Sequence, residues 1–566
     1  MYAPFLIFVN GKGMVMSRFS LTINTSMKTK NFFQSHLPYC TLLMACPLTG
    51  VAGEDAKVPH GTPQPNILMI VCEDISPYLG CYGDKVAVTP HLDRFSGQAV
   101  RHTNMYTCVG VSSPSRYSLI TGRYASADGA NYMRSNYFNK QFGVVPPEGV
   151  KCYTEFMRQH GYYCTNNAKT DYQFPAPDAA WDEQGAKAHW KHAPENRPFF
   201  SIFNLNVTHE SFIWKNADKP LAVSPDSVLL PPYYPDTKIV RHDHAVLYSN
   251  IKEMDRQFQV LLDELEKSGR AGNTIVIFYS DNGGPLPRAK REIMDSGTKV
   301  PFMIRFPDGR GAGTLNEQMN MFVDIPATVL SLAGIKPASY MHGQPMYGSY
   351  KEKRERKYVF GATDRFDEQV EKRGSIRTNR YLYIRNYMPG QSVYRPVQFR
   401  LAMPMMREML ELYANGGLDE AQSRWFNLPS GGEELYDCEA DPYQIHNLVD
   451  DPAYAGVLKK MRKAYRKEWM EPFNRDWEAE KEEFFVQRMW PDGKKPVCEQ
   501  PKLSQEEGRL VVKNDLSVYS ALYRKEGEKR WLLYTVPVSF AAGEKIEVKL
   551  ERLGYASSET VFQSWK

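Results

Sequence analysis

A serine-rich stretch, residues 110–123 (GVSSPSRYSLITGR), carries the residue types of a nucleophilic site. Pro114 restricts the backbone ahead of a turn, and short serine side chains can cap a helix that begins near Ser115 and continues to residue 121. Ser112 would then lie at the helix N-terminus, where backbone N–H groups and the helix dipole favour an anion. The stretch therefore predicts an anion site beside Ser112, against the alternative of an ordinary Ser/Pro turn.

Oxygen-bearing side chains follow two apolar runs, residues 66–72 (NILMIVC) and 274–279 (TIVIFY), which are typical of buried parallel strands. The four side chains are Glu73 and Asp74 after the first run, and Asp281 and Asn282 after the second. The carboxyl ends of strands in an open α/β sheet are where ligands bind, and hard oxygen donors suit Ca²⁺ or Mg²⁺. The pattern predicts a metal site, with solvated carboxylates in turns as the alternative.

Basic side chains follow further segments of the same kind. Lys169 comes after a helix-then-strand unit in residues 155–165, and His209 comes after the apolar run 198–207 (PFFSIFNLNV). Lys290 lies shortly after the second pair of oxygen donors. A histidine whose pKa sits near neutral pH is a natural general acid for a leaving group. Surface lysines and a satisfied core histidine are the ordinary alternatives.

The order of these segments predicts the architecture. Strands that alternate with helices indicate a mostly parallel sheet with helices on both faces, hence an α/β fold. Residues 243–265 have helical periodicity, and we assign their Met and Phe stripe to core packing. From about residue 358 the pattern changes to antiparallel strands and then a long amphipathic helix over 453–469. Residues 510–566 alternate as the short strands of a small β module.

The S-x-P-S-R of residues 112–116 and the L-I-T-G-R of residues 119–123 resemble the signature of type I sulfatases. In that family the Cys or Ser at the Ser112 position is oxidised to the aldehyde formylglycine. S-D-N-G at residues 280–283 is similar to a second sulfatase segment, and the whole resemblance covers about residues 66–469. It looks most like the sulfamidase-like branch. It implies an alkaline-phosphatase-like sheet, a smaller C-terminal α+β subdomain and a terminal β accessory module.

The resemblance also implies a role for each candidate residue. The hydrate of formylglycine at Ser112 attacks sulfur, and Arg116 orients that hydrate and lowers its pKa. Lys169 and Lys290 bind the transferring sulfuryl group, and His209 protonates the leaving group. A calcium ion, with magnesium as the less favoured choice, screens the sulfate charge as a Lewis acid. Its expected ligands are Glu73, Asp74, Ser112, Asp281 and Asn282.

Two positions depart from the family pattern. Glu73 stands where sulfatases have Asp and is one methylene longer. Asp171 stands where His is expected, and Asp cannot donate a proton at neutral pH unless its pKa is strongly raised. In the antiparallel region, Arg365, Arg377 and Arg380 are candidates for contacts with an anionic sugar, with solvated surface as the favoured interpretation.

The N-terminus is typical of a targeting segment. Residues 27–30 (MKTK) are positively charged, residues 37–45 (LPYCTLLMA) form a short apolar core, and a small-residue cleavage site follows near Ala52. Residues 43–46 also resemble a lipobox, which makes Cys46 a candidate lipidated residue. We therefore expect an exported protein, in the periplasm or on the outer surface. The expected segments are an over-long start (1–26), a signal peptide (27–52), a catalytic domain (63–345), a C-terminal subdomain (346–480) and the β module (503–566).

Composition excludes other classes. The chain has 566 residues, of which 42% are hydrophobic and 24% charged, and its formal net charge is only +5. Because no Lys/Arg run or zinc-like Cys/His spacing occurs, we expect no nucleic-acid partner. No run beyond the signal approaches the roughly 20 apolar residues of a membrane-spanning helix. Cys152 and Cys164 could pair, with buried free thiols as the alternative.

Together these features predict a sulfuric ester hydrolase whose substrate is a sulfated glycan. The branch resemblance suggests a glycosaminoglycan such as heparan, sulfated on nitrogen or oxygen of glucosamine. Ser112 in place of Cys implies a maturation partner, an anaerobic radical-SAM enzyme. Two alternatives stay open: a phosphodiesterase or phosphatase of the same superfamily that uses unmodified Ser112, and a non-catalytic glycan-binding protein.

Overall fold

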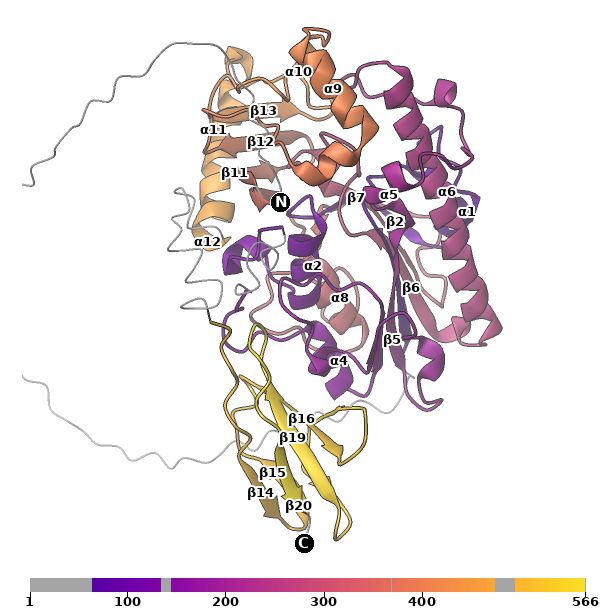
Figure 1. Ribbon diagram of the computed structural model, residues 1–566, viewed down its shortest axis with the longest axis vertical. Coiled ribbons are helices and arrows are strands. Elements are labelled where there is room, and N and C mark those ends of the chain that lie inside the picture. Colours follow the sequence, from indigo (N-terminus) through magenta and orange to yellow (C-terminus); the bar gives the residue numbers. More distant parts are fainter. Residues whose placement is uncertain (1–63, 134–143, 368, 474–493, 565–566) are drawn as a thin grey trace, which may run out of the picture. The chain divides into compact units, whose positions relative to one another are not determined.

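A nine-stranded sheet, whose strands lie between Asn66 and Met321, forms the centre of the first part of the described chain (Figure 1). The computed structural model describes residues 64–133, 144–367, 369–473 and 494–564, so the predicted signal peptide and Cys46 lie outside the described residues. The strand order is β4-β3-β5-β1-β6-β7-β2-β8, with β9 paired to β2. The strands are β1 (Asn66–Cys72), β2 (Val100–Tyr106), β3 (Tyr163–Asn167), β4 (Glu183–Gln184), β5 (Phe199–Leu205), β6 (Thr274–Ser280), β7 (Lys299–Arg305), β8 (Leu315–Asn316) and β9 (Asn320–Met321).

The sheet is mostly parallel, as the sequence predicts. Strand β1 is central and pairs in parallel with both β5 and β6, and β3 pairs in parallel with β5. Strand β7 is the exception, since it runs antiparallel to both β6 and β2. The parallel strands place their carboxyl ends at one edge of the sheet, where the residues that follow β1, β3, β5 and β6 can meet.

Helices cover both faces because successive side chains of a buried strand point to opposite sides. Along β1, Ile67 and Met69 belong to one hydrophobic cluster, and Leu68 and Ile70 belong to the other. In Figure 1, α2, α4 and α8 lie on one side of the strands, and α1 and α6 lie on the other. These helices are α1 (Pro90–Ser96), α2 (Ser112–Thr121), α4 (Tyr153–Gln159), α6 (Lys238–Lys267) and α8 (Asp324–Leu332).

A second, antiparallel sheet follows in the order β10-β11-β12-β13. Its strands are β10 (Val359–Phe366), β11 (Gln369–Arg377), β12 (Tyr381–Asn386) and β13 (Glu433–Asp437). Along the chain, α9 (Pro404–Ala414) and α10 (Glu420–Ser423) come between β12 and β13, and α11 (Ala455–Ala464) and α12 (Glu471–Phe473) follow β13. One hydrophobic cluster contains Val109 and Val111 from the first part together with Phe360 and Leu435 from this sheet. The two parts therefore share a core.

The C-terminal residues form two small antiparallel sheets. One contains β14 (Leu503–Glu506), β15 (Arg509–Val512) and β18 (Val538–Ser539), and the other contains β16 (Ser520–Lys525), β17 (Leu532–Leu533), β19 (Lys545–Glu551) and β20 (Val561–Ser564). Polar contacts join this module to the region of α4: Lys151 Nζ donates to the carbonyls of Leu516 and Tyr519 at 2.8 and 3.0 Å, and Glu551 accepts from the Ala179 N–H at 3.0 Å. These contacts hold the module against the first part of the chain.

Several predicted boundaries change. Helix α2 begins at Ser112, three residues before the expected start, and α6 extends beyond residues 243–265 at both ends. The predicted helix over 453–469 is α11 followed by a π-helical turn, Tyr465–Met470. Cys152 and Cys164 are buried free thiols, not a disulfide. Within the described residues, no helix combines the length and apolar character needed to cross a membrane.

Leu68 tests the two-faced packing of β1, because its side chain is fully buried among the residues of one cluster. Leu68→Ala should lower the free energy of unfolding by about 2–5 kcal/mol through lost burial and the cavity left behind. The matched control is Leu229→Ala, since Leu229 is 64% exposed, and it should change stability by less than about 0.5 kcal/mol. Chemical denaturation monitored by fluorescence measures both, and equal effects would contradict the assignment of Leu68 to the core.

Candidate active site

The ends of β1 and β6 bring four oxygen-bearing side chains together. The two strands pair with Cys72 opposite Ser280, so the residues that follow them are neighbours. The Asp74 N–H donates to Asp281 Oδ1 at 3.2 Å, and Asn282 Nδ2 donates to Asp74 Oδ1 at 2.9 Å. One ligand oxygen from each of Glu73, Asp74 and Asp281 lies within 4.8 Å of the others. All four side chains are buried; we call them the strand-end cluster.

Ser112 faces this cluster from the first turn of α2. Its Oγ donates to Asn282 Oδ1 at 3.1 Å, and Ser115 Oγ donates to the Asp281 carbonyl at 2.5 Å. Val111, the residue before the helix, makes no side-chain cap hydrogen bond. The side chain before the helix therefore does not occupy the first backbone N–H groups of α2, and these groups can attract an anion beside Ser112.

Arg116 contacts carboxylates of the strand-end cluster from both strand ends, β1 and β6. Its guanidinium donates to Asp281 Oδ2 at 2.9 Å, to Glu73 Oε1 at 2.7 Å and to Asn204 Oδ1 at 2.7 Å. Burial opposes ionisation, yet Asp281 and Glu73 outweigh it and raise the pKa of Arg116. Burial likewise acts to raise the pKa of Asp281, but Arg116 and the nearby lysines lower it below the usual range. The pair stays ionised.

Two lysines complete the positive charge. Lys169 Nζ donates to Glu73 Oε2, and Lys290 Nζ donates to Asp74 Oδ2 at 2.5 Å. Burial acts to lower the pKa of both lysines, but Glu73 beside Lys169, and Asp74 with Glu210 beside Lys290, raise each pKa above its ordinary value. Both ammonium groups therefore remain charged and surround the carboxylates near Ser112.

His209 follows β5 after a short 3₁₀ turn, Asn206–Thr208. The Ser211 N–H donates to its Nδ1 at 3.2 Å, which leaves the proton of the neutral ring on Nε2. Burial and the positive charge of Lys290 lower the pKa of His209 to about 3. The ring is therefore neutral at neutral pH in the free protein, and its role as general acid stays a prediction. A bound anion that offsets the lysine charge would favour the protonated ring.

The donor set fits a hard divalent cation. Three buried carboxylates offer ligand oxygens within 4.8 Å of one another, and hard oxygen donors of this kind suit Ca²⁺. Burial, together with Asp281 and Glu210, raises the pKa of Asp74 even though Lys290 contacts it. Glu73, although one methylene longer than Asp, still offers a ligand oxygen to this group.

Glu210 and Arg291 belong to a second group of buried charges that no sequence motif indicates. Glu210 accepts from Arg291 at 2.9 and 3.0 Å and lies 3.3 Å from Lys290 Nζ, while its N–H donates to Asp74 Oδ2 at 2.7 Å. Arg291 also pairs with Asp367, after β10, at 3.0 Å. The only available signal was position, since Glu210 is next to His209 and Arg291 is next to Lys290.

The remaining candidates lie apart from the strand-end cluster or at its edge. Asp171 accepts from Ser113 Oγ through its carbonyl at 2.9 Å, and its carboxylate lies 3.3 Å from Lys169. Arg377 is buried and pairs with Asp295 at 2.7 Å, so the prediction that it lies on the solvated surface is wrong. Arg380 is exposed and pairs with Asp437, whereas Arg365 is half-buried.

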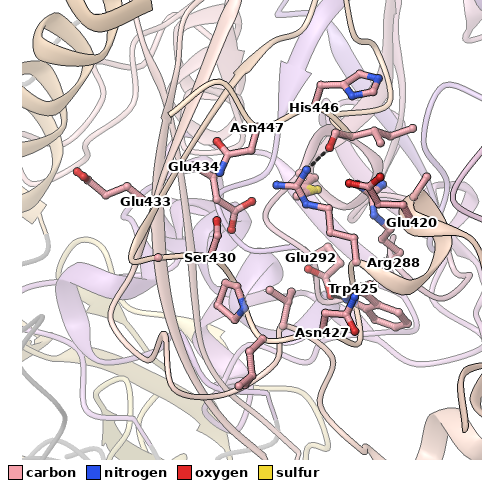
Figure 2. A pocket seen from close by; sticks show the side chains of 18 of the residues that line it. Arg288, Glu292, Glu420, Trp425, Asn427, Ser430, Glu433, Glu434, His446 and Asn447 are labelled. Atoms are coloured by element: carbon pink, nitrogen blue, oxygen red, sulfur yellow. Dashed lines mark hydrogen bonds between the residues drawn. The ribbon is translucent and has the colours of Figure 1, made fainter. Parts of the chain in front are cut away.

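A separate cavity of about 680 Å³ lies beside β13 (Figure 2). Arg424 is among its lining residues and donates to the Ile445 carbonyl. Its charged lining residues are Glu292, Asp419, Glu420, Glu433, Glu434, Asp450, Arg288 and Arg424. Because carboxylates outnumber arginines there, a sulfated chain would be repelled. The strand-end cluster is the better candidate for an anionic ester.

Comparisons with known proteins find two matching family models and similar relatives. The family model described as Sulfatase matches residues 65–335, and the model described as N-sulphoglucosamine sulphohydrolase, C-terminal, matches residues 288–396. An ulvan-active sulfatase of Formosa agariphila is 38% identical over 560 residues, which cover 91% of this chain and 93% of that protein. Human N-sulphoglucosamine sulphohydrolase is 23% identical, with 75% of this chain and 92% of the human protein covered.

A similar solved structure supports the fold. The phosphonate monoester hydrolase of Agrobacterium radiobacter superposes with a TM-score of 0.53 at 16% identity, covering 80% of this chain and 100% of that chain. At this identity the likeness concerns the alkaline-phosphatase-like fold alone.

Arg116→Gln tests whether this guanidinium stabilises the buried carboxylates. We expect the free energy of unfolding, measured in chelator without divalent cations, to fall by about 3–5 kcal/mol, because two buried carboxylates lose their partner. The control is Arg256→Gln on α6, whose side chain is 60% exposed and pairs with Glu253; its unfolding curve should not move. Equal curves for the wild type and Arg116→Gln would refute the stabilising role.

Proposed function

The chain belongs to the sulfatase family, and on that premise we propose that it hydrolyses sulfate groups of a sulfated polysaccharide, with formylglycine derived from Ser112 as nucleophile and calcium at the strand-end cluster. The observation that carries this proposal is the position of Ser112 Oγ, 3.1 Å from Asn282 at the end of a buried set of carboxylates. The resident cation would supply Lewis-acid neutralisation of sulfate charge.

The chain's own residues would position and polarise the ester. The first N–H groups of α2 and the two ammonium groups of Lys169 and Lys290 bind the sulfuryl oxygens, where negative charge is concentrated. Arg116 holds Glu73 and Asp281 in their relative positions through its three hydrogen bonds. Because these groups are fixed before substrate arrives, little reorganisation is needed in the reaction.

His209 would donate a proton to the leaving oxygen. In the free protein its pKa is lowered to about 3, so the ring is neutral at neutral pH. The negative charge of a bound sulfate ester acts against the positive charge of Lys290 and Lys169 and raises that pKa, which favours the protonated ring.

Ulvan is the substrate we propose first, because the relative named for activity on ulvan is similar over nearly the whole chain. A glycosaminoglycan such as heparan is the second candidate, since the C-terminal family model carries the name of N-sulphoglucosamine sulphohydrolase. We also propose export to the periplasm or outer surface, and maturation of Ser112 by an anaerobic radical-SAM enzyme.

Mass spectrometry of the tryptic peptide that ends at Arg116, combined with sulfate release from ulvan and heparan, tests the nucleophile. Protein co-expressed with an anaerobic maturase should lose two hydrogens at Ser112 and release sulfate, because the hydrated aldehyde is the attacking group. Ser112→Ala should do neither, whereas Ser118→Ala, in the middle of α2, should retain both.

Unmodified Ser112 in native protein that hydrolyses phosphate esters would replace this proposal with a phosphoesterase. Modified protein that binds glycan without turnover would replace it with a glycan-binding role.

His209→Asn tests the general acid. We expect kcat to fall by about 10²–10⁴ for a sugar sulfate, whose alcohol leaves poorly without a proton, and far less for an aryl sulfate with a good leaving group. His160→Asn is the matched control, since His160 is exposed at the end of α4. Equal losses on the two substrates would refute the role of His209.

A further inference from the structure

Two aromatic side chains adjoin His209. The Phe399 ring lies 6.4 Å from the His209 ring and 5.1 Å from the ring of Trp214, measured between centroids. Phe399 belongs to the 3₁₀ turn Gln398–Ala402, and Trp214 belongs to α5 (Ser211–Lys215). Both side chains are partly exposed. Residues nearly 200 positions apart in sequence thus meet beside the proposed acid; we call Phe399 and Trp214 the aromatic pair.

His209 has charged groups as its other neighbours. Lys290, Lys169 and Glu73 all act electrostatically on its ring. Glu210, the residue after His209, lies 3.3 Å from Lys290 Nζ, so the chain at His209 connects a proposed sulfate-binding ammonium group with the aromatic pair. A leaving oxygen that receives a proton from His209 carries its sugar within reach of Phe399 and Trp214.

The aromatic pair is held in place from two directions. Next to Phe399, the buried Arg400 donates to the carbonyl of Lys290 at 3.3 Å and its guanidinium lies 5.1 Å from the Trp425 ring. At the end of α5, Asn216 Nδ2 donates to Asn250 Oδ1 at 2.7 Å, which fixes α5 to α6. Phe399 is thus tied to the backbone of the residue that supplies a sulfate-binding ammonium group.

We propose that the aromatic pair binds the ring of the sugar that carries the cleaved sulfate. The inference rests on the proposed function and names a subsite within it. The C–H face of a pyranose is apolar and fits a flat aromatic surface, while its hydroxyl and sulfate groups point to polar partners. The pair supplies affinity for the sugar and no group to the chemical step, so it acts on KM.

Steady-state kinetics with sulfated ulvan oligosaccharides test the subsite in protein with formylglycine at position 112. Phe399→Ala and Trp214→Ala should each raise KM about tenfold with kcat nearly unchanged. Phe399→Tyr should have a KM close to that of the wild type because it keeps the aromatic face. Phe399→Leu should have a raised KM, although it keeps most of the apolar volume. Phe562→Ala is the control, since Phe562 is 61% exposed in the C-terminal module.

The outcomes separate the subsite from the function. Unchanged KM in both Phe399→Leu and Trp214→Ala, with the wild type active, would overturn the subsite alone. No sulfate release by the modified wild type from ulvan or heparan would overturn the proposed function. If Phe399→Ala lowers the thermal midpoint, the comparison of Phe399→Tyr with Phe399→Leu decides the question.

Discussion

The pairing of buried carboxylates with buried cations at the ends of β1 and β6 is the constraint on which the rest of the site depends. Charges removed from water are costly unless each one is paired and hydrogen-bonded. Arg116 meets this requirement for Glu73 and Asp281, and Lys290 meets it for Asp74. Helix α2 and the two strands are consequently fixed relative to one another, and Ser112 at the start of the helix has a defined position.

The same charge pairing extends into the second sheet. Glu210 links Lys290 to Arg291, and Arg291 reaches Asp367 after β10. Arg373 on β11 pairs with Glu292, two residues after Lys290. The C-terminal part therefore contributes to the position of the loop that carries Lys290, in agreement with the shared hydrophobic cluster. It also supplies Phe399, which places a sugar-facing surface beside chemistry provided by the first sheet.

Features that depend on neighbouring residues in the sequence could be predicted from the sequence alone. The apolar runs that became β1 and β6, the oxygen donors after them and the mostly parallel sheet could all be read from consecutive residues. Glu210, Asp367 and Phe399 could not, because their partners lie far away in sequence. The burial of Arg377 has no local signal for the same reason, since its partner Asp295 lies about 80 positions away in sequence. The pKa of His209 depends on burial and on Lys290, neither of which has a sequence signature.

The metal content of the purified protein tests the central claim most directly. Elemental analysis by inductively coupled plasma mass spectrometry, after dialysis against trace calcium, should find about one calcium ion per chain in the wild type. Asp281→Asn, which keeps the size of the side chain but removes one carboxylate, should hold far less. An absence of bound metal in the wild type, or equal calcium in the two proteins, would contradict the account of the strand-end cluster as a cation site.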